Sequence, residues 1–198
     1  MEENKEMAIL QAAEEEFLEK GFDGARTVSI AQKAGVTHAM LHYYFRTKEQ
    51  LFQKILDEKM DLFTASVLSV ISDTEKPLLE RLEAGIRRHF DFLAANPGLP
   101  GFIIGEARKN GQVIGDLLRK KGLPLISQTQ FELDALAAEG KIARVDAVNL
   151  LLDVVSQNVF PFIVLPIAGA VFEEKKANDI LATVKEENVT IIKKRLQV

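Results

Sequence analysis

Two histidines and two tyrosines are crowded into one short stretch of this chain. Residues 37–44 hold two of its three His and both of its Tyr. His38 and His42 are four positions apart, so on a helix both rings lie on one face, with Tyr43 beside them. Such a face could contact base edges and phosphates in a DNA major groove, hold a zinc ion, or remain a solvated helix surface.

Catalytic and metal chemistry finds little support elsewhere in the sequence. The residues between the two histidines lack the Glu of a metalloprotease helix, and no third zinc ligand is evident. The chain has no Cys, and no phosphate-cradling glycine loop or nucleophile elbow occurs. His89 is interpreted as a semi-buried residue and the run Glu14–Glu16 as a solvated helix face. We therefore predict no enzyme, no cofactor and no metal site.

The elements that must position this face are helical. Apolar residues recur with a period near 3.6, which predicts an all-α chain. Composition agrees with a globular domain, since 47% of the residues are apolar and 27% are charged. The predicted helices cover about 4–20, 28–34, 38–45, 48–72, 75–95, 100–110, 113–121, 124–139, 145–160 and 174–196.

The first three predicted helices are short and have the proportions of a helix-turn-helix. Gly21 suits the end of the first, Thr27 can cap the second, and Gly35 closes it in a tight turn. Thr37 is then a natural N-cap for the third helix. The outward face of the third helix is His38, Ala39, His42 and Tyr43, with Met40 near its edge. The inward residues of the three helices together are Ile9, Ala13, Phe17, Ile30, Ala31, Ala34, Leu41, Tyr44 and Phe45.

The run from Ala25 to Phe52 resembles the DNA-binding domain of tetracycline-repressor-like (TetR family) regulators. The matching elements are Thr27, Ile30-Ala31, Ala34-Gly35-Val36, Leu41, Tyr43-Tyr44-Phe45 and Lys48-Glu49-Gln50-Leu51. The resemblance implies a homodimeric, ligand-controlled repressor that binds a palindromic operator in double-stranded DNA.

The resemblance also implies roles for single residues. The first residues of the third helix would contact bases, and residues further along the chain would contact phosphates. Thr27 would anchor the start of the second helix. The base-facing residues are Thr37, His38, Ala39 and Met40, and the phosphate-holding residues are Tyr43, Tyr44 and Lys48. His42 stands where the family commonly has Tyr, so a contact there would need the imidazole to donate in its place.

Charge along the N-terminal part is uneven. Residues 2–19 contain one Lys and seven Glu, a net charge of −6, whereas residues 21–48 contain four basic residues and one Asp, a net charge of +3. Because phosphate neutralisation supplies most non-specific affinity for DNA, we expect weak non-specific binding and a steep dependence on salt.

The fourth predicted helix should join two domains. Thr47 and Gln50 have the spacing of a capping box, so a helix begins near 48. We place a helix-turn-helix DNA-binding domain at 1–46 and a helical ligand-binding and dimerisation domain at 47–198.

The larger domain is expected to hold a small, largely hydrophobic effector, because helical pockets are lined mainly by apolar and aromatic groups with a few polar ones. Most of its Phe residues are interpreted as core. The candidate effector contacts are Phe63, His89, Phe90, Phe102, Glu106, Gln128, Phe131, Gln157 and Asn158.

Helices near 145–160 and 174–196 carry more apolar surface than one small domain buries, which predicts a homodimer formed through them. The apolar run from Val159 to Phe172 is 14 residues long and holds two prolines, so it is interpreted as buried surface and not as a membrane span. The first residues lack a signal-peptide pattern, so the expected location is the cytoplasm.

Two other classes of function stay open at this point. One is an all-α protein-interaction module whose His and Tyr face docks a protein and binds no DNA. The other is an enzyme on an all-α scaffold, which would reveal itself by turnover or by a bound cofactor.

Overall fold

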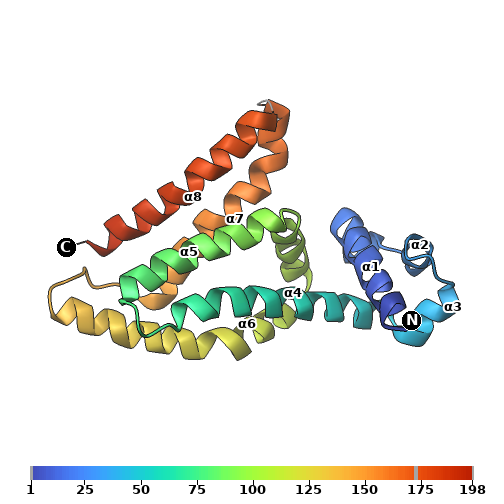
Figure 1. Ribbon diagram of the computed structural model, residues 1–198, viewed down its shortest axis with the longest axis horizontal. Helices are drawn as coiled ribbons and strands as arrows, with labels where there is room; N and C mark the ends of the chain where they lie inside the picture. Colours follow the sequence, from blue (N-terminus) through green and yellow to red (C-terminus); the bar gives the residue numbers. More distant parts are fainter. Residues whose placement is uncertain (1, 172–173, 198) are drawn as a thin grey trace. The chain divides into compact units, whose positions relative to one another are not determined.

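The computed structural model describes residues 2–171 and 174–197, and all regular secondary structure in this part of the chain is helical (Figure 1). This confirms the predicted all-α class, with 84% of the residues in helices. The helices are α1 Glu2–Gly24, α2 Thr27–Lys33, α3 His38–Tyr44, α4 Lys48–Ile71, α5 Leu78–Ala95, α6 Leu99–Ala138, α7 Ala147–Val171 and α8 Glu174–Leu196. Within α6, α7 and α8 some side chains lie outside the description, at 106, 109, 110, 113, 114, 117, 118, 120–122, 165, 166, 168 and 174–178.

The chain divides into two compact units. The first consists of Met1–Leu62 and Phe102–Gly111, and the second of Phe63–Gly101 and Gln112–Val198. Helices α4 and α6 each contribute residues to both units. The functional division at residues 46 and 47 stays a prediction.

The first unit is built around aromatic rings and aliphatic side chains from α1 to α4. Phe17 packs edge-on against Phe52, with ring centroids 5.3 Å apart, and Phe52 also contacts Phe22 and Phe102. Burying one such side chain stabilises a fold by about 1.5–3 kcal/mol. The predicted inward residues Ile9, Ala13, Phe17, Ile30, Ala31, Leu41 and Phe45 are all buried, and Ala34 and Tyr44 pack against this core.

One long helix, α6, replaces three predicted ones between residues 100 and 139. The helix continues through its glycines and Pro124 from Leu99 to Ala138. A glycine inside a helix costs only about 1 kcal/mol and a proline about 3, which packing along a long helix can offset. Among the described residues, φ is positive at Gly21, Gly35 and Gly140. Gly21 interrupts the regular geometry of α1, and Gly35 and Gly140 lie just after the ends of α2 and α6.

Helix α7 also runs further than predicted. It continues through Pro161 and Pro166 to Val171, where the sequence predicts an end near residue 160. The interpretation of this run as buried is wrong for the single chain, because Phe160 is 63% exposed and Ile167 is 65% exposed. By length and composition α7 could cross a membrane, a test that core helices of soluble proteins and signal sequences also pass.

The second unit packs α5, α7 and α8 against one another, as Figure 1 shows. Its apolar core includes Ile86, Leu150 and Ile192. Buried Arg81 joins helix ends, since its guanidinium donates to the carbonyl oxygens of Ile71 (2.8 Å) and Lys76 and pairs with Glu132. Carbonyls at a helix end lack partners within the helix, so this buried Arg satisfies the end of α4.

Candidate functional site

The turn between α2 and α3 has a fixed geometry that follows from its sequence. Helix α2 ends at Lys33, and Gly35 adopts a left-handed conformation with φ of 66°. The amide of Val36 donates to the carbonyl of Ala31 (3.0 Å), and the amide of Gly35 donates to that of Gln32 (3.2 Å). This pair of bonds is a Schellman motif, which requires glycine at its left-handed position. The predicted tight turn is confirmed.

Both threonines at the helix starts make hydrogen bonds, but only one is a cap. Thr37 Oγ1 accepts from the amide of Met40 at 3.2 Å, which confirms it as the N-cap of α3. The prediction that Thr27 caps α2 is wrong, because the N-cap position is Arg26 and no side chain caps it. Thr27 Oγ1 instead lies 3.0 Å from His38 Nε2, so it ties the start of α2 to the start of α3.

The outward face of α3 is organised by its two histidines. Their ring centroids are 4.4 Å apart and the rings are nearly perpendicular. His42 Nδ1 lies 3.2 Å from the carbonyl oxygen of Arg46, just beyond the end of the helix. Tyr43 is 76% exposed, and its ring contacts that of half-buried Tyr44. Thr37 and Ala39 are exposed and Met40 is half-buried.

Lys48, by contrast, is partly used inside the protein. Its ammonium donates to the carbonyl oxygens of Phe22 (2.8 Å) and Ala25 (3.1 Å) and lies 4.5 Å from the centre of the Phe22 ring. These contacts fasten the start of α4 to the end of α1. An ammonium has three donors, so one N–H is left for a phosphate.

A buried ion pair holds α1 against α2, although no local pattern of residues predicts it. Glu16 is fully buried, and its carboxylate contacts the ammonium groups of Lys20 (2.7 Å) and Lys33 (2.9 Å). Burial raises the pKa of Glu16, but hydrogen bonds from Lys20, Lys33 and Ser29 outweigh it and lower the pKa to about 2. The same contact with Glu16 raises the pKa of Lys33. The interpretation of Glu16 as part of a solvated face is therefore wrong.

The acidity of the first helix is thus partly neutralised within the unit. Glu14 pairs with Lys59 at 2.7 Å, and Glu19 with Lys33 at 3.4 Å. Three of the seven glutamates counted in the sequence therefore face cations. Because Lys33 is held in these ion pairs, the exposed Arg26 and Arg46 remain as basic groups near α3.

In the second unit a chain of buried polar side chains links α5, α7 and α8. The Asn158 amide donates to the Ile86 carbonyl (2.9 Å) and lies 3.4 Å from His89 Nδ1, while the Asn188 amide donates to Asn158 Oδ1 (2.9 Å). Burial lowers the pKa of His89 to about 4. The neutral ring also contacts Phe63, at 5.2 Å between centroids.

Only some of the predicted effector contacts meet in this cluster. Phe63, His89, Gln157 and Asn158 belong to it, since the backbone carbonyl of Gln157 accepts from Asn188. Phe90 packs beside them against Phe162. The others lie apart: Phe102 belongs to the core of the first unit, Gln128 is exposed, Phe131 is 78% exposed, and the side chain of Glu106 is outside the described residues.

Asn188 was missed from the sequence. Its signal is a polar residue at an inward helical position, flanked by Val184, Val189 and Ile192.

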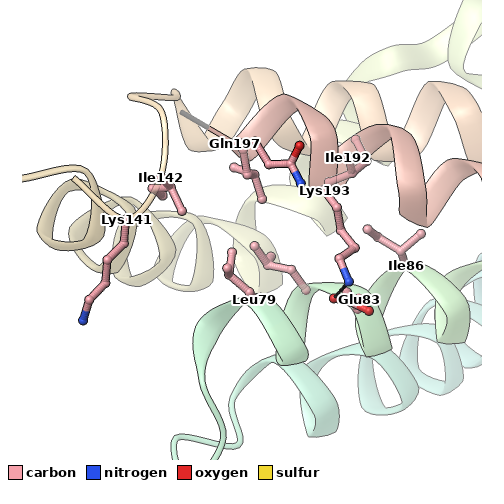
Figure 2. Close-up of a pocket in the computed structure, with 10 residues that line it drawn as sticks. Leu79, Glu83, Ile86, Lys141, Ile142, Ile192, Lys193 and Gln197 are labelled. Carbon is pink, nitrogen blue, oxygen red and sulfur yellow. Dashed lines mark ion pairs between the residues drawn. The ribbon is translucent and has the colours of Figure 1, made fainter. Parts of the chain in front are cut away.

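A cavity of about 120 Å³ opens elsewhere in this unit, between α5, the C-terminal end of α8 and the segment before α7 (Figure 2). Ile86, Ile142 and Ile192 line it, and none of the predicted effector contacts does. Figure 2 shows Lys193 and Glu83 pointing toward each other across its rim, where they pair at 2.7 Å. Ligand pockets usually measure roughly 300–1,000 Å³, so this cavity is too small for a long effector.

Comparison with known proteins points in one direction. Residues 9–55 match the family model described as "Bacterial regulatory proteins, tetR family". The HTH-type transcriptional regulator RutR of Escherichia coli is 28% identical over 147 residues, which are 74% of this chain and 68% of RutR. The fatty acid metabolism regulator protein of Bacillus subtilis is 32% identical over 95 residues, 48% of each chain.

The fold as a whole is also shared with solved regulators. The transcriptional regulator FadR of Bacillus subtilis, crystallised with stearoyl-CoA, superposes with a TM-score of 0.72 at 21% identity, covering 96% of this chain and 99% of that one. At this level of identity the likeness establishes the common fold.

Proposed function

The chain belongs to the tetR family of bacterial regulatory proteins, and from this premise we propose that it is a homodimeric repressor that binds a palindromic operator and is released by a small, largely hydrophobic effector. It is a transcriptional regulator and not an enzyme. The observation that carries the proposal is the exposed face of α3, held in place by the Schellman turn, the Thr37 cap and the Thr27–His38 contact.

In this proposal α3 enters the major groove. Thr37, His38, Ala39 and Met40 face bases, and Tyr43 reaches a phosphate from its exposed position. Further phosphate contacts come from Thr27, Tyr44 and Lys48, the last through its remaining N–H. Because few free cations lie near α3, few phosphates are neutralised, so we expect a modest affinity and a shallower dependence on salt than a strongly basic domain shows.

We place the dimer interface on α7 and α8. The exposed apolar side chains of one chain include Leu152 (59%), Phe160 (63%) and Ile191 (50%). Surfaces of this kind are buried in obligate dimers, and a second copy would cover them by two-fold symmetry. This interpretation also accounts for the apolar length of α7 without a membrane. It supports the proposal that the protein acts in the cytoplasm.

The effector site is proposed in the second unit, at Phe63, His89, Phe90, Gln157 and Asn158. The relative solved with stearoyl-CoA makes a long-chain acyl thioester the first class to test. The start of α4 lies in the first unit and its end in the second, so a shift of α4 on effector binding would change the spacing of the two α3 helices. By linkage, operator DNA must then weaken effector binding by the same factor.

The test is selection of the purified protein against random duplex DNA at low salt, followed by a salt titration of the enriched sequence. We expect a palindrome bound by a dimer, with affinity lost in His38→Ala and Tyr43→Ala. Leu79→Ala changes a residue that lines the small cavity of the second unit; it is the control and should bind normally. Folded, dimeric, ligand-free protein that enriches no sequence would favour the alternative of a protein-interaction module without DNA binding.

A further inference from the structure

The hydrogen bond of His42 fixes which of its ring nitrogens carries a proton. Nδ1 lies 3.2 Å from the carbonyl oxygen of Arg46. A carbonyl oxygen only accepts hydrogen bonds, so Nδ1 must be the donor. In the neutral imidazole, which has one N–H, Nε2 then presents a lone pair and can only accept.

That lone pair is available on the surface proposed to face DNA. His42 is exposed, and no second hydrogen bond to its ring occurs within the described part of the chain. The ring lies against that of His38 on the same face of α3. Four residues of helix advance about 6 Å along the axis, so the two histidines can reach different base pairs.

We propose that His42 reads an exocyclic amino group of a base, adenine N6 or cytosine N4, through Nε2, and does not hold a phosphate. The inference rests on the proposed DNA-binding function and assigns a specificity-determining role within it. Phosphate oxygens accept hydrogen bonds, so the Nε2 lone pair repels them. In the major groove the donors are the amino groups of adenine and cytosine, and these are the partners that an acceptor can select.

The carbonyl of Arg46 is therefore a positioning group for recognition. Since α3 has ended before residue 46, this oxygen has no partner within the helix, and a His in the last turn can satisfy it. The contact holds the ring in one tautomer and one orientation before DNA arrives.

The test uses the operator selected from random DNA, at pH 8, where imidazole side chains are ordinarily neutral. Each adenine of a half-site is replaced in turn by purine, which lacks the N6 amine, and each cytosine by 2-pyrimidinone, which lacks the N4 amine. A parallel series replaces single phosphates by methylphosphonates. Binding of the wild type, His42→Phe and Leu79→Ala is measured by fluorescence anisotropy.

We expect one position where amine removal weakens the wild type by about 3- to 10-fold per half-site but leaves His42→Phe unaffected. Leu79→Ala, which changes a residue of the second unit, is the control and should keep this sensitivity. A modified base pair is also weaker, but this changes the affinity of all three proteins equally. The difference between the wild type and a variant is therefore free of this effect.

Two results would overturn the inference while leaving the regulator intact: equal amine sensitivity in wild type and His42→Phe at every position, or a methylphosphonate effect that disappears in His42→Phe. Failure to bind any duplex would instead overturn the proposed function, and the assignment of His42 with it.

Discussion

Removing the charge of Glu16 should loosen the first unit. Glu16→Gln keeps the size of the side chain but deletes the carboxylate that meets Lys20 and Lys33. The pKa of Glu16 is about 2, against an ordinary value of 4.5. A difference of this size corresponds to roughly 3 kcal/mol of stability.

The expected loss at pH 7 is smaller than that upper figure. The side chains of Lys20 and Lys33 are 40% and 35% exposed, so water screens their attraction for the carboxylate. We expect Glu16→Gln to lower the free energy of unfolding of this unit by about 2 kcal/mol. Glu15→Gln, which changes the exposed neighbour on the same helix, should cost no more than about 0.5 kcal/mol.

The pH dependence gives a second signature. Because folding lowers the pKa of Glu16, its contribution is fully present above the unfolded value near 4.5 and is lost as the pH falls toward 2. The difference between wild type and Glu16→Gln should therefore shrink as the pH is lowered from 5 to 3.

Urea unfolding followed by circular dichroism measures the free energies, and amide hydrogen exchange in α1 and α2 assigns the loss to the first unit. The reasoning is refuted if Glu16→Gln costs no more than Glu15→Gln at pH 7. It is equally refuted if the cost of Glu16→Gln is unchanged at pH 3.

Three further predictions concern other parts of the chain. Burial lowers the pKa of His89 to about 4, so the unfolded state binds more protons than the folded state between pH 6.5 and 4. Urea titrations should show that about 3 kcal/mol of stability is lost as the pH falls through that window. His89→Gln should abolish this dependence of stability on pH. Arg87→Ala removes an exposed ion pair with Glu186 (2.9 Å). It should lower the free energy of unfolding by at most about 1 kcal/mol at low salt and by almost nothing in 1 M NaCl, because salt screens exposed pairs. A loss of stability that does not depend on salt would contradict this. Gly35→Ala places a side chain on a left-handed backbone with φ of 66°. Thermal unfolding should show a loss of about 1–2 kcal/mol of stability. A variant as stable as the wild type would show that the turn tolerates another conformation.

Features that depend on a few neighbouring residues were predictable from the sequence. Thr37 and Thr47 each accept from the amide three residues on, at 3.2 Å, as their spacing predicts. Gly21 and Gly35 have the positive φ expected of helix-ending glycines. The TetR resemblance likewise follows from a continuous run, and the family match over residues 9–55 confirms it.

Features that depend on competition between distant segments were not predictable. The glycines and Pro124 of α6 resemble those that end helices, yet the helix continues through them. The run Glu14–Glu16 looks uniformly solvated, yet Lys33, seventeen positions after Glu16, makes one of the three a buried ion-pair partner. The proposed contacts of α3 with DNA remain predictions that the designed selections test.

The sequence by itself therefore determined the helical class, the helix-turn-helix and its Thr37 cap, because these depend on hydrophobic period and on hydrogen bonds that span three to five residues. Only the tertiary structure decided which polar groups are buried and paired, such as Glu16 and Asn188, and which apolar ones stay outside, such as Phe131. The physical reason is that burial and partner choice are set by contacts between segments, whose free energies outweigh local preference and leave no mark in the local sequence.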